Sequence, residues 1–283
     1  MSDGTWRPKV VFANLTCLKL RARYNVPQNA TYEDVFGGLL AATPNLKSLE
    51  LCEFQAIRGK FRLPPRLTSL VLIETSIPGS DLAQIAGAAP RLEKYCTWFY
   101  DVRTQQQPQL TGDLLRPLSQ LALADTLVGL SLGGSNFDKI PSDGIMRRFH
   151  ALRVLGISYF SEATQHEGNR DLLIQLIKDC SQLAVLVVNG ADRIGRDTLI
   201  RFATAVSRQE APETLRKVKL IVKKYEPHLP GPRTRHSWKT LRAMAKKPVA
   251  ALFRAGNVEL GLHRGRREEI ARWFEELGTG SEW

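Results

Sequence analysis

The chain has 283 residues and carries 40 Lys and Arg against 28 Asp and Glu, which gives a formal net charge of +12. Hydrophobic residues make up 43% of the sequence, enough for a continuous core, yet no apolar run is long enough to cross a bilayer. The first residues contain no apolar stretch suited to a secretory signal, so we expect a cytoplasmic or nuclear protein without a membrane segment.

A short leucine pattern recurs along the chain, with a step of three residues followed by a step of two. Its second copy consists of Leu46, Leu49 and Leu51. A step of two places both side chains on one face of a strand, so each copy predicts a chain turn followed by a short strand. The other copies are Leu15/Leu18/Leu20, Leu67/Leu70/Leu72, Leu127/Leu130/Leu132, Leu152/Leu155/Ile157, Leu183/Leu186/Val188 and Leu215/Val218/Leu220, with a degenerate copy at Leu92/Tyr95 and a last strand near Val258.

Segments with helical periodicity separate several of these strands. We predict helices within residues 31–43, 80–89, 169–180 and 196–208. Strands of three residues are not stable alone, so they must stack on one another. The sequence therefore predicts an α/β solenoid, a horseshoe with a parallel β-sheet on its concave face and helices on its convex face.

One stretch resembles the cysteine-containing leucine-rich repeat. The places of that family pattern hold Leu173, Leu176, Cys180, Leu183, Leu186, Val188 and Ile194. Two other stretches keep the spacing, with Thr43 and Phe149 in the place of the cysteine. The resemblance covers nearly the whole chain and is closest to the recognition domains of F-box/leucine-rich-repeat proteins, particularly the irregular fungal ones. Such a repeat specifies a fold rather than a function.

The resemblance implies a non-catalytic protein–protein interaction module that recognises substrates for an SCF-type ubiquitin ligase. It also implies a protein partner on the concave face and, as a further partner, a Skp1-like adaptor. No F-box is recognised in the sequence, because residues 1–14 are too few for that helical module. The module therefore either lacks an F-box of its own or is separated from it.

The repeat rhythm weakens after about residue 222. We predict a leucine-rich-repeat solenoid over residues 1–222, followed by a basic C-terminal repeat and helical cap over residues 223–283, continuous with it. Two helices are expected, within 237–247 and 267–278. The second has an apolar stripe formed by Ile270, Trp273, Phe274 and Leu277, which suits a cap on the solenoid or a helix that docks on another protein.

Positive charge is concentrated near the C-terminal end. Residues 216–272 contain sixteen Lys and Arg against four Glu, whereas residues 1–215 contain 24 against 21 acidic residues. Lys217 and Lys219 point away from Val218 and Leu220 and so belong to the concave face. This concentration of positive charge favours, as an alternative function, the binding of an acidic partner or of nucleic acid. A scaffold in a larger assembly, with no ligase link, is a third possibility.

The partner-binding surface is predicted to be the concave face, where residues between the leucines point. Aromatic side chains just beyond the strands are typical binding anchors. The candidate contact residues are Arg21, Glu50, Trp98, Tyr100, Tyr159, Lys217 and Lys219.

Catalytic chemistry finds no support in the sequence. None of the five histidines belongs to a recognisable metal or nucleophile motif, and the four cysteines have no metal-ligand spacing. The sequence predicts neither an enzyme nor a bound cofactor or metal, and it predicts reduced cysteines packed in the fold.

Overall fold

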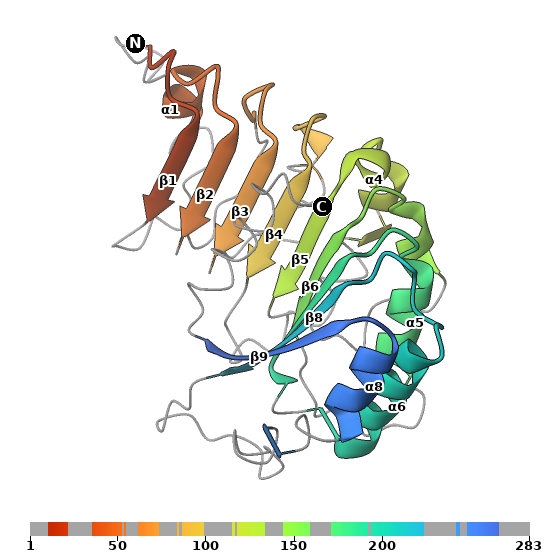
Figure 1. The fold of residues 1–283 in the computed structure, drawn as a ribbon. Helices are drawn as coiled ribbons and strands as arrows, with labels where there is room; N and C mark the ends of the chain where they lie inside the picture. The colour runs from red at the N-terminus through yellow and green to blue at the C-terminus, as the bar shows by residue number, and fades with distance from the viewer. Residues whose placement is uncertain are drawn as a thin grey trace.

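The computed structural model describes residues 11–21, 36–52, 54, 62–73, 84, 87–98, 115, 116, 118–133, 144–158, 171–191, 194–223, 242, 243 and 248–265. A single parallel sheet organises these residues, and its strands follow one another in chain order (Figure 1). The nine strands are β1 (Cys17–Arg21), β2 (Ser48–Cys52), β3 (Ser69–Ile73), β4 (Lys94–Trp98), β5 (Gly129–Gly133), β6 (Val154–Ser158), β7 (Val185–Asn189), β8 (Lys217–Lys223) and β9 (Glu259–Gly265). The predicted parallel sheet of short leucine strands is confirmed.

The register of the strands lines the leucines up into continuous rows. Leu49 pairs with Leu70, and Leu51 pairs with Leu72. In β4 the same two places hold Tyr95 and Thr97, which are 0% and 2% exposed. The degenerate copy therefore forms a strand like the others, because its side chains still fill the interior.

Each leucine before the step of three lies in a turn rather than in the strand. The Leu46 N–H donates to the Thr43 carbonyl at 3.1 Å, and the Leu183 N–H donates to the Cys180 carbonyl at 3.1 Å. Phe149 accepts from Leu152 in the same way at 3.2 Å. This turn explains why a step of three residues precedes a step of two. The accepting residues Thr43, Phe149 and Cys180 occupy equivalent positions in their repeats.

A second set of backbone hydrogen bonds ties each turn to the one before it. The carbonyl of Thr16 accepts from the N–H groups of both Lys47 and Ser48, at 2.8 and 3.0 Å. The carbonyl of Lys47 accepts from Thr68 and Ser69 in the same manner, at 2.8 and 2.9 Å. This shared-acceptor pattern recurs at the turns before β4, β5, β6, β7 and β8. Neighbouring turns thus satisfy each other's backbone groups, which a lone repeat could not do.

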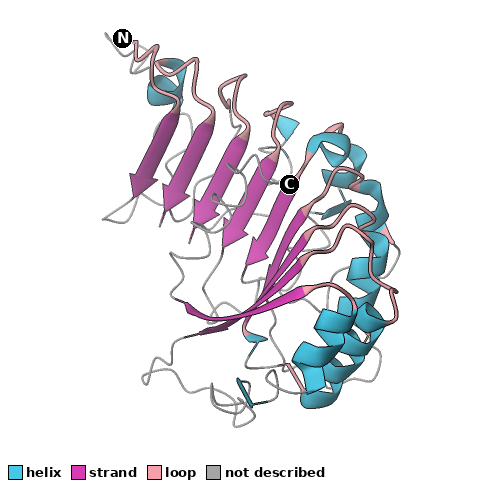
Figure 2. Ribbon diagram, in the orientation of Figure 1, coloured by secondary structure: helices cyan, strands magenta, loops and turns pink. Residues whose placement is uncertain are grey.

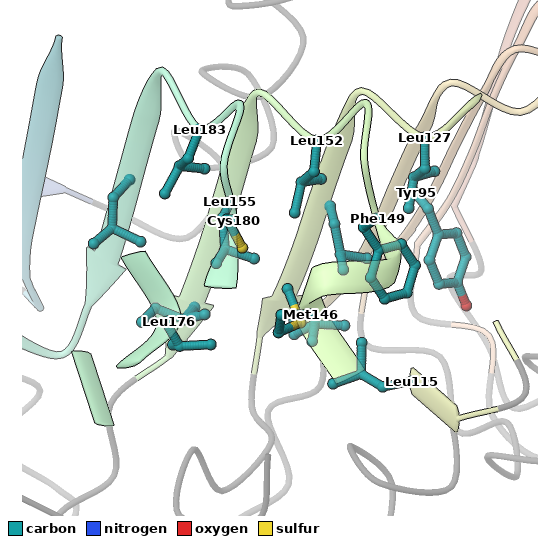
Figure 3. Packing of buried hydrophobic residues seen from close by; sticks show 14 of the residues in the cluster. Tyr95, Leu115, Leu127, Met146, Phe149, Leu152, Leu155, Leu176, Cys180 and Leu183 are labelled. Carbon is teal, nitrogen blue, oxygen red and sulfur yellow. The ribbon is translucent and has the colours of Figure 1, made fainter. Parts of the chain in front are cut away.

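The described helices lie along one face of the sheet, which we call the helix face (Figure 2). They are α1 (Gly38–Ala41), α4 (Leu123–Thr126), the 3₁₀ helix η3 (Ile145–Arg148), α5 (Leu172–Asp179), α6 (Arg196–Ser207) and α8 (Ala250–Ala255). Their apolar side chains and the strand leucines form one core cluster, part of which Figure 3 shows. Residues 31–35 and most of 80–89, where helices were expected, lie outside the described residues.

The C-terminal part of the described chain continues the same architecture. β8 spans the position at which the sequence suggested a division, and β9 pairs with it over seven residues. Val249, Phe253 and Val258 are buried in the core, so residues 249–265 supply a further helix and strand. The helix expected within 267–278, and all but 242 and 243 of the one expected within 237–247, lie outside the described residues.

Candidate functional site: the second face of the sheet

The face of the sheet opposite the described helices carries three residues from each of β1 to β7 and four from each of β8 and β9, and we call it the second face. Its middle row, set by the strand register, consists of Lys19, Glu50, Val71, Cys96, Ser131, Gly156, Val187, Lys219 and Gly261. The two flanking rows lie two residues to either side along each strand. The face is therefore charged at both ends and largely apolar between them.

The N-terminal end of the second face holds a small polar cluster on β1 and β2. Glu50 is 6% exposed and forms an ion pair with Lys19, whose side chain is 63% exposed. The Cys52 thiol donates a hydrogen bond of 3.1 Å to Glu50 Oε1. The Glu50 carboxylate is thus bound by groups of its own chain. Lys19 and Arg21 are the exposed charged side chains at this end of the second face.

This cluster favours the protonated form of the Cys52 thiol. Burial, followed by the hydrogen bond to Glu50 and the charge of that carboxylate, raises the pKa of Cys52 from 9.0 to about 12. The thiolate is the nucleophilic form of cysteine. Cys52 therefore stays protonated at neutral pH and serves as a hydrogen-bond donor rather than as a nucleophile.

The middle of the second face is apolar and buried. We call this cluster the apolar patch; it consists of Val71, Cys96, Val154, Val185, Val187 and Ile221, on β3, β4, β6, β7 and β8. Val71 and Ile221 are each 0% exposed. The patch is separate from the main core cluster, because the sheet itself lies between them.

The C-terminal end of the second face is polar again. Lys217 Nζ lies 2.7 Å from Glu259 Oε2 on the neighbouring strand, and their side chains are 30% and 62% exposed. Lys219 is half-buried beside them. The ring of His263 leans over Gly261, where a Cβ atom would stand 2.8 Å from Nε2.

The predicted contact residues do not gather into one compact site. Arg21 and Glu50 lie at one end of the second face, and Lys217 and Lys219 lie on β8 at the other. Six strand spacings separate β2 from β8, about 29 Å of sheet. Trp98 ends β4, but its side chain is not described, and Tyr100 and Tyr159 lie outside the described residues.

Sequence reasoning missed the apolar patch as a feature. None of the six patch residues is among the contact residues predicted for the concave face. A signal was present at β7, whose four residues from 185 to 188 are all apolar. Such a continuous apolar run is typical of a strand that is buried on both faces.

Within the described part of the chain, no three His, Cys, Asp or Glu side chains converge in a way that could hold a metal ion. None of the described helices is long and apolar enough to span a membrane. No family model matches the sequence, and no curated protein matches it.

Proposed function

We propose that this protein is a non-catalytic protein–protein interaction module, built as a leucine-rich-repeat solenoid whose concave surface is the second face. The observation that supports the proposal best is the chain-order stacking of parallel strands, which gives the sheet one face packed against the described helices and a second face on which no described helix lies. Repeat arrays of this kind offer extended surfaces for partners.

The partner contacts belong to the two ends of the second face. At one end Lys19 and Arg21 are exposed, and at the other Lys217 and Glu259 are partly so. Between them the apolar patch is buried. An elongated protein with acidic groups near both ends fits this distribution, because its charges complement Lys19, Arg21 and Lys219.

The ligase connection is the more specific form of the proposal. In that form the protein recognises substrates for an SCF-type ubiquitin ligase in the cytoplasm or nucleus. The repeat spacing around Cys180 supports this form by resemblance alone.

The proposal is tested by affinity capture with this protein as bait, comparing variants in which the charge of one surface residue is reversed. Arg21→Glu should remove the captured partner, because it reverses an exposed charge on the second face. Arg148→Glu makes the same charge change on η3 at the helix face and should leave capture intact. Equal capture by wild type and Arg21→Glu contradicts a partner on this face.

The salt dependence of the same capture separates a protein partner from nucleic acid. Nucleic-acid binding through basic groups weakens log-linearly with salt, with a slope of about −0.9 per neutralised phosphate on duplex DNA. Retention that resists nuclease supports a protein partner, whereas loss after nuclease treatment together with a steep log-linear fall between 50 and 200 mM salt contradicts it.

A further inference from the structure

The first described repeat is exposed at a place where other repeats are buried. The Leu15 N–H donates to the Phe12 carbonyl at 3.1 Å, so Phe12 occupies the position that Thr43, Phe149 and Cys180 hold in their repeats. Those three residues are 0%, 2% and 1% exposed, whereas Phe12 is 47% exposed. No described repeat precedes Phe12, and its ring therefore lacks the cover that a neighbouring repeat gives.

The strand residues of the two leucine rows are incompletely covered at both edges of the sheet. Leu18 and Leu20 on β1, and Leu260 and Leu262 on β9, are only partly buried. From β2 to β8 every member of these two rows is at most 3% exposed. The apolar interior therefore reaches the surface at both ends of the described repeat array, which a solenoid normally closes with a cap.

We propose that the last described repeat of one copy of this chain stacks on the first described repeat of a second copy, so that β9 pairs in parallel with β1 across the contact. This inference goes beyond the proposed function and does not depend on it, because the contact uses the edges of the sheet rather than its second face.

The backbone groups at the two edges are complementary. Between repeats, the carbonyl before one strand accepts from two N–H groups at the start of the next, as Thr16 does from Lys47 and Ser48. At β9 the equivalent carbonyl is that of Val258, and at β1 the equivalent N–H groups are those of Thr16 and Cys17. No described residue bonds to that carbonyl or to those N–H groups. β9 of one copy thus offers β1 of the next the same acceptor that each interior strand offers its neighbour.

The apolar rows also match when the register of the sheet is continued into the second copy. Leu260 then faces Leu18 of the second copy, and Leu262 faces its Leu20. Both rows run on without a break, and the partly buried leucines of the two edges cover one another.

Charge favours this head-to-tail contact over a symmetric one. In the continued register Glu259, 62% exposed, lies diagonally across from Lys19 of the second copy, 63% exposed, and the two charges are opposite. Pairing β1 with β1 would instead set Lys19 and Arg21 of one copy against the same residues of the other, and facing like charges are destabilising.

The two edges lie at opposite ends of the curved sheet, so they meet only between chains (Figure 1). A contact between two different surfaces is not closed by one pairing, because each added copy presents a fresh edge. The expected assembly is therefore a ring or an open filament rather than a closed dimer.

The contact is tested with the native Cys17 and the variant Glu259→Cys in the full chain. The continued register sets these residues opposite each other, with Cα atoms about 4.8 Å apart, within the range of about 4.4–6.8 Å that a disulfide spans. Mild oxidation should give at least about tenfold more disulfide-linked oligomer than in Arg254→Cys, a control at an exposed position of α8 in the same repeat. Non-reducing electrophoresis measures the yield, and mass spectrometry of the digest identifies the linked cysteines.

A second variant tests the apolar part of the contact without oxidation. Phe12→Glu changes a side chain that is 47% exposed, so the fold should tolerate it, and it should weaken association in sedimentation velocity at least about tenfold. Arg208→Glu, an exposed residue after α6, should associate as wild type does.

Three results would overturn the inference. A wild-type chain that stays monomeric at every concentration has no such contact. Equal yields of oligomer from Glu259→Cys and Arg254→Cys would show that the two edges do not meet in this register. A product linked through Cys17 of both copies would show that β1 pairs with itself. None of these results involves a partner on the second face, so failure here is distinct from failure of the proposed function.

Discussion

A Cβ atom on Gly156 would stand 2.6 Å from the hydroxyl oxygen of Ser131, which lies directly opposite it on the neighbouring strand. It would also lie 3.0 Å from the Ser131 Cβ atom. Ser131 is itself 2% exposed, so its side chain has little room to move away. The glycine in β6 is therefore required by a side chain that leans over it from β5.

The first prediction is that Gly156→Ala destabilises the fold by about 1–3 kcal/mol, the usual cost of forcing an extra carbon into a packed site. Urea unfolding measures the change. Ser131→Gly removes the obstructing atoms, so Gly156→Ala should cost clearly less in that background. An equal cost in both backgrounds would show that Ser131 is not the obstacle.

The second prediction concerns the buried hydroxyl of Tyr95, which finds no hydrogen-bond partner among the described residues. Its ring lies among the buried side chains of the neighbouring repeats (Figure 3). Tyr95→Phe removes an unsatisfied polar group and should raise the free energy of unfolding by about 1 kcal/mol. Tyr95→Leu restores the repeat pattern but leaves a cavity, and it should destabilise. A lower stability of the Phe variant would reveal that the hydroxyl has a partner.

The third prediction is a loss of stability at alkaline pH that depends on Cys180. Burial first, and the Asp179 carboxylate second, raises the pKa of the Cys180 thiol from 9.0 to about 12. Above pH 9 the unfolded chain releases this proton while the folded chain keeps it. Stability is therefore full below pH 9 and falls as the pH rises toward 12, by about 1.4 kcal/mol per pH unit.

Cys180→Ala tests this dependence when the unfolding free energy is compared at pH 8 and pH 10. The variant should lose about 1 kcal/mol less than wild type between the two values, whatever its stability at pH 8. Cys17→Ala, at an exposed position, is the control and should follow wild type. A Cys180→Ala curve parallel to that of wild type would contradict the assigned pKa.

The fourth prediction is that Glu50→Gln makes Cys52 more reactive. The substitution removes the carboxylate charge that helps to raise the pKa of Cys52, although burial remains the larger cause. Each unit by which that pKa falls increases the thiolate fraction about tenfold at a given pH. Alkylation of Cys52 followed between pH 8 and 10 measures the shift. Glu93→Gln, at an exposed position before β4, should leave the profile unchanged, and an unaltered Glu50→Gln profile would refute the role of the carboxylate.

Much of the fold could be predicted because its signal is local. The spacing of Leu46, Leu49 and Leu51 encodes a turn and then a strand, and the structure has both. The helix over residues 196–207 was equally clear, since Leu199, Phe202 and Val206 lie on one helical stripe and are buried. The final repeat was harder to predict, because a proline-rich stretch precedes it and interrupts the spacing of apolar residues, which resumes at Val249 and Phe253.

The candidate site was predicted less well, because it depends on contacts between repeats. The sequence assigned Glu50 to the second face correctly, but it offered the residue as a partner contact. The structure shows that Lys19 and Cys52 already engage its carboxylate. Lys217 was assigned to the same face, but its ion pair with Glu259 requires two strands that stand 42 residues apart to be in register.

By itself, the sequence determined which residues form strands and which side of each strand faces the helices, because alternation along a strand is a property of its own backbone. Only the tertiary structure decided which residues of the second face are buried and which are exposed. It brings Val71, Cys96 and Ile221 into one buried patch although they come from repeats far apart in the chain. Burial depends on what lies above a side chain, and nothing in the local spacing of leucines carries that information.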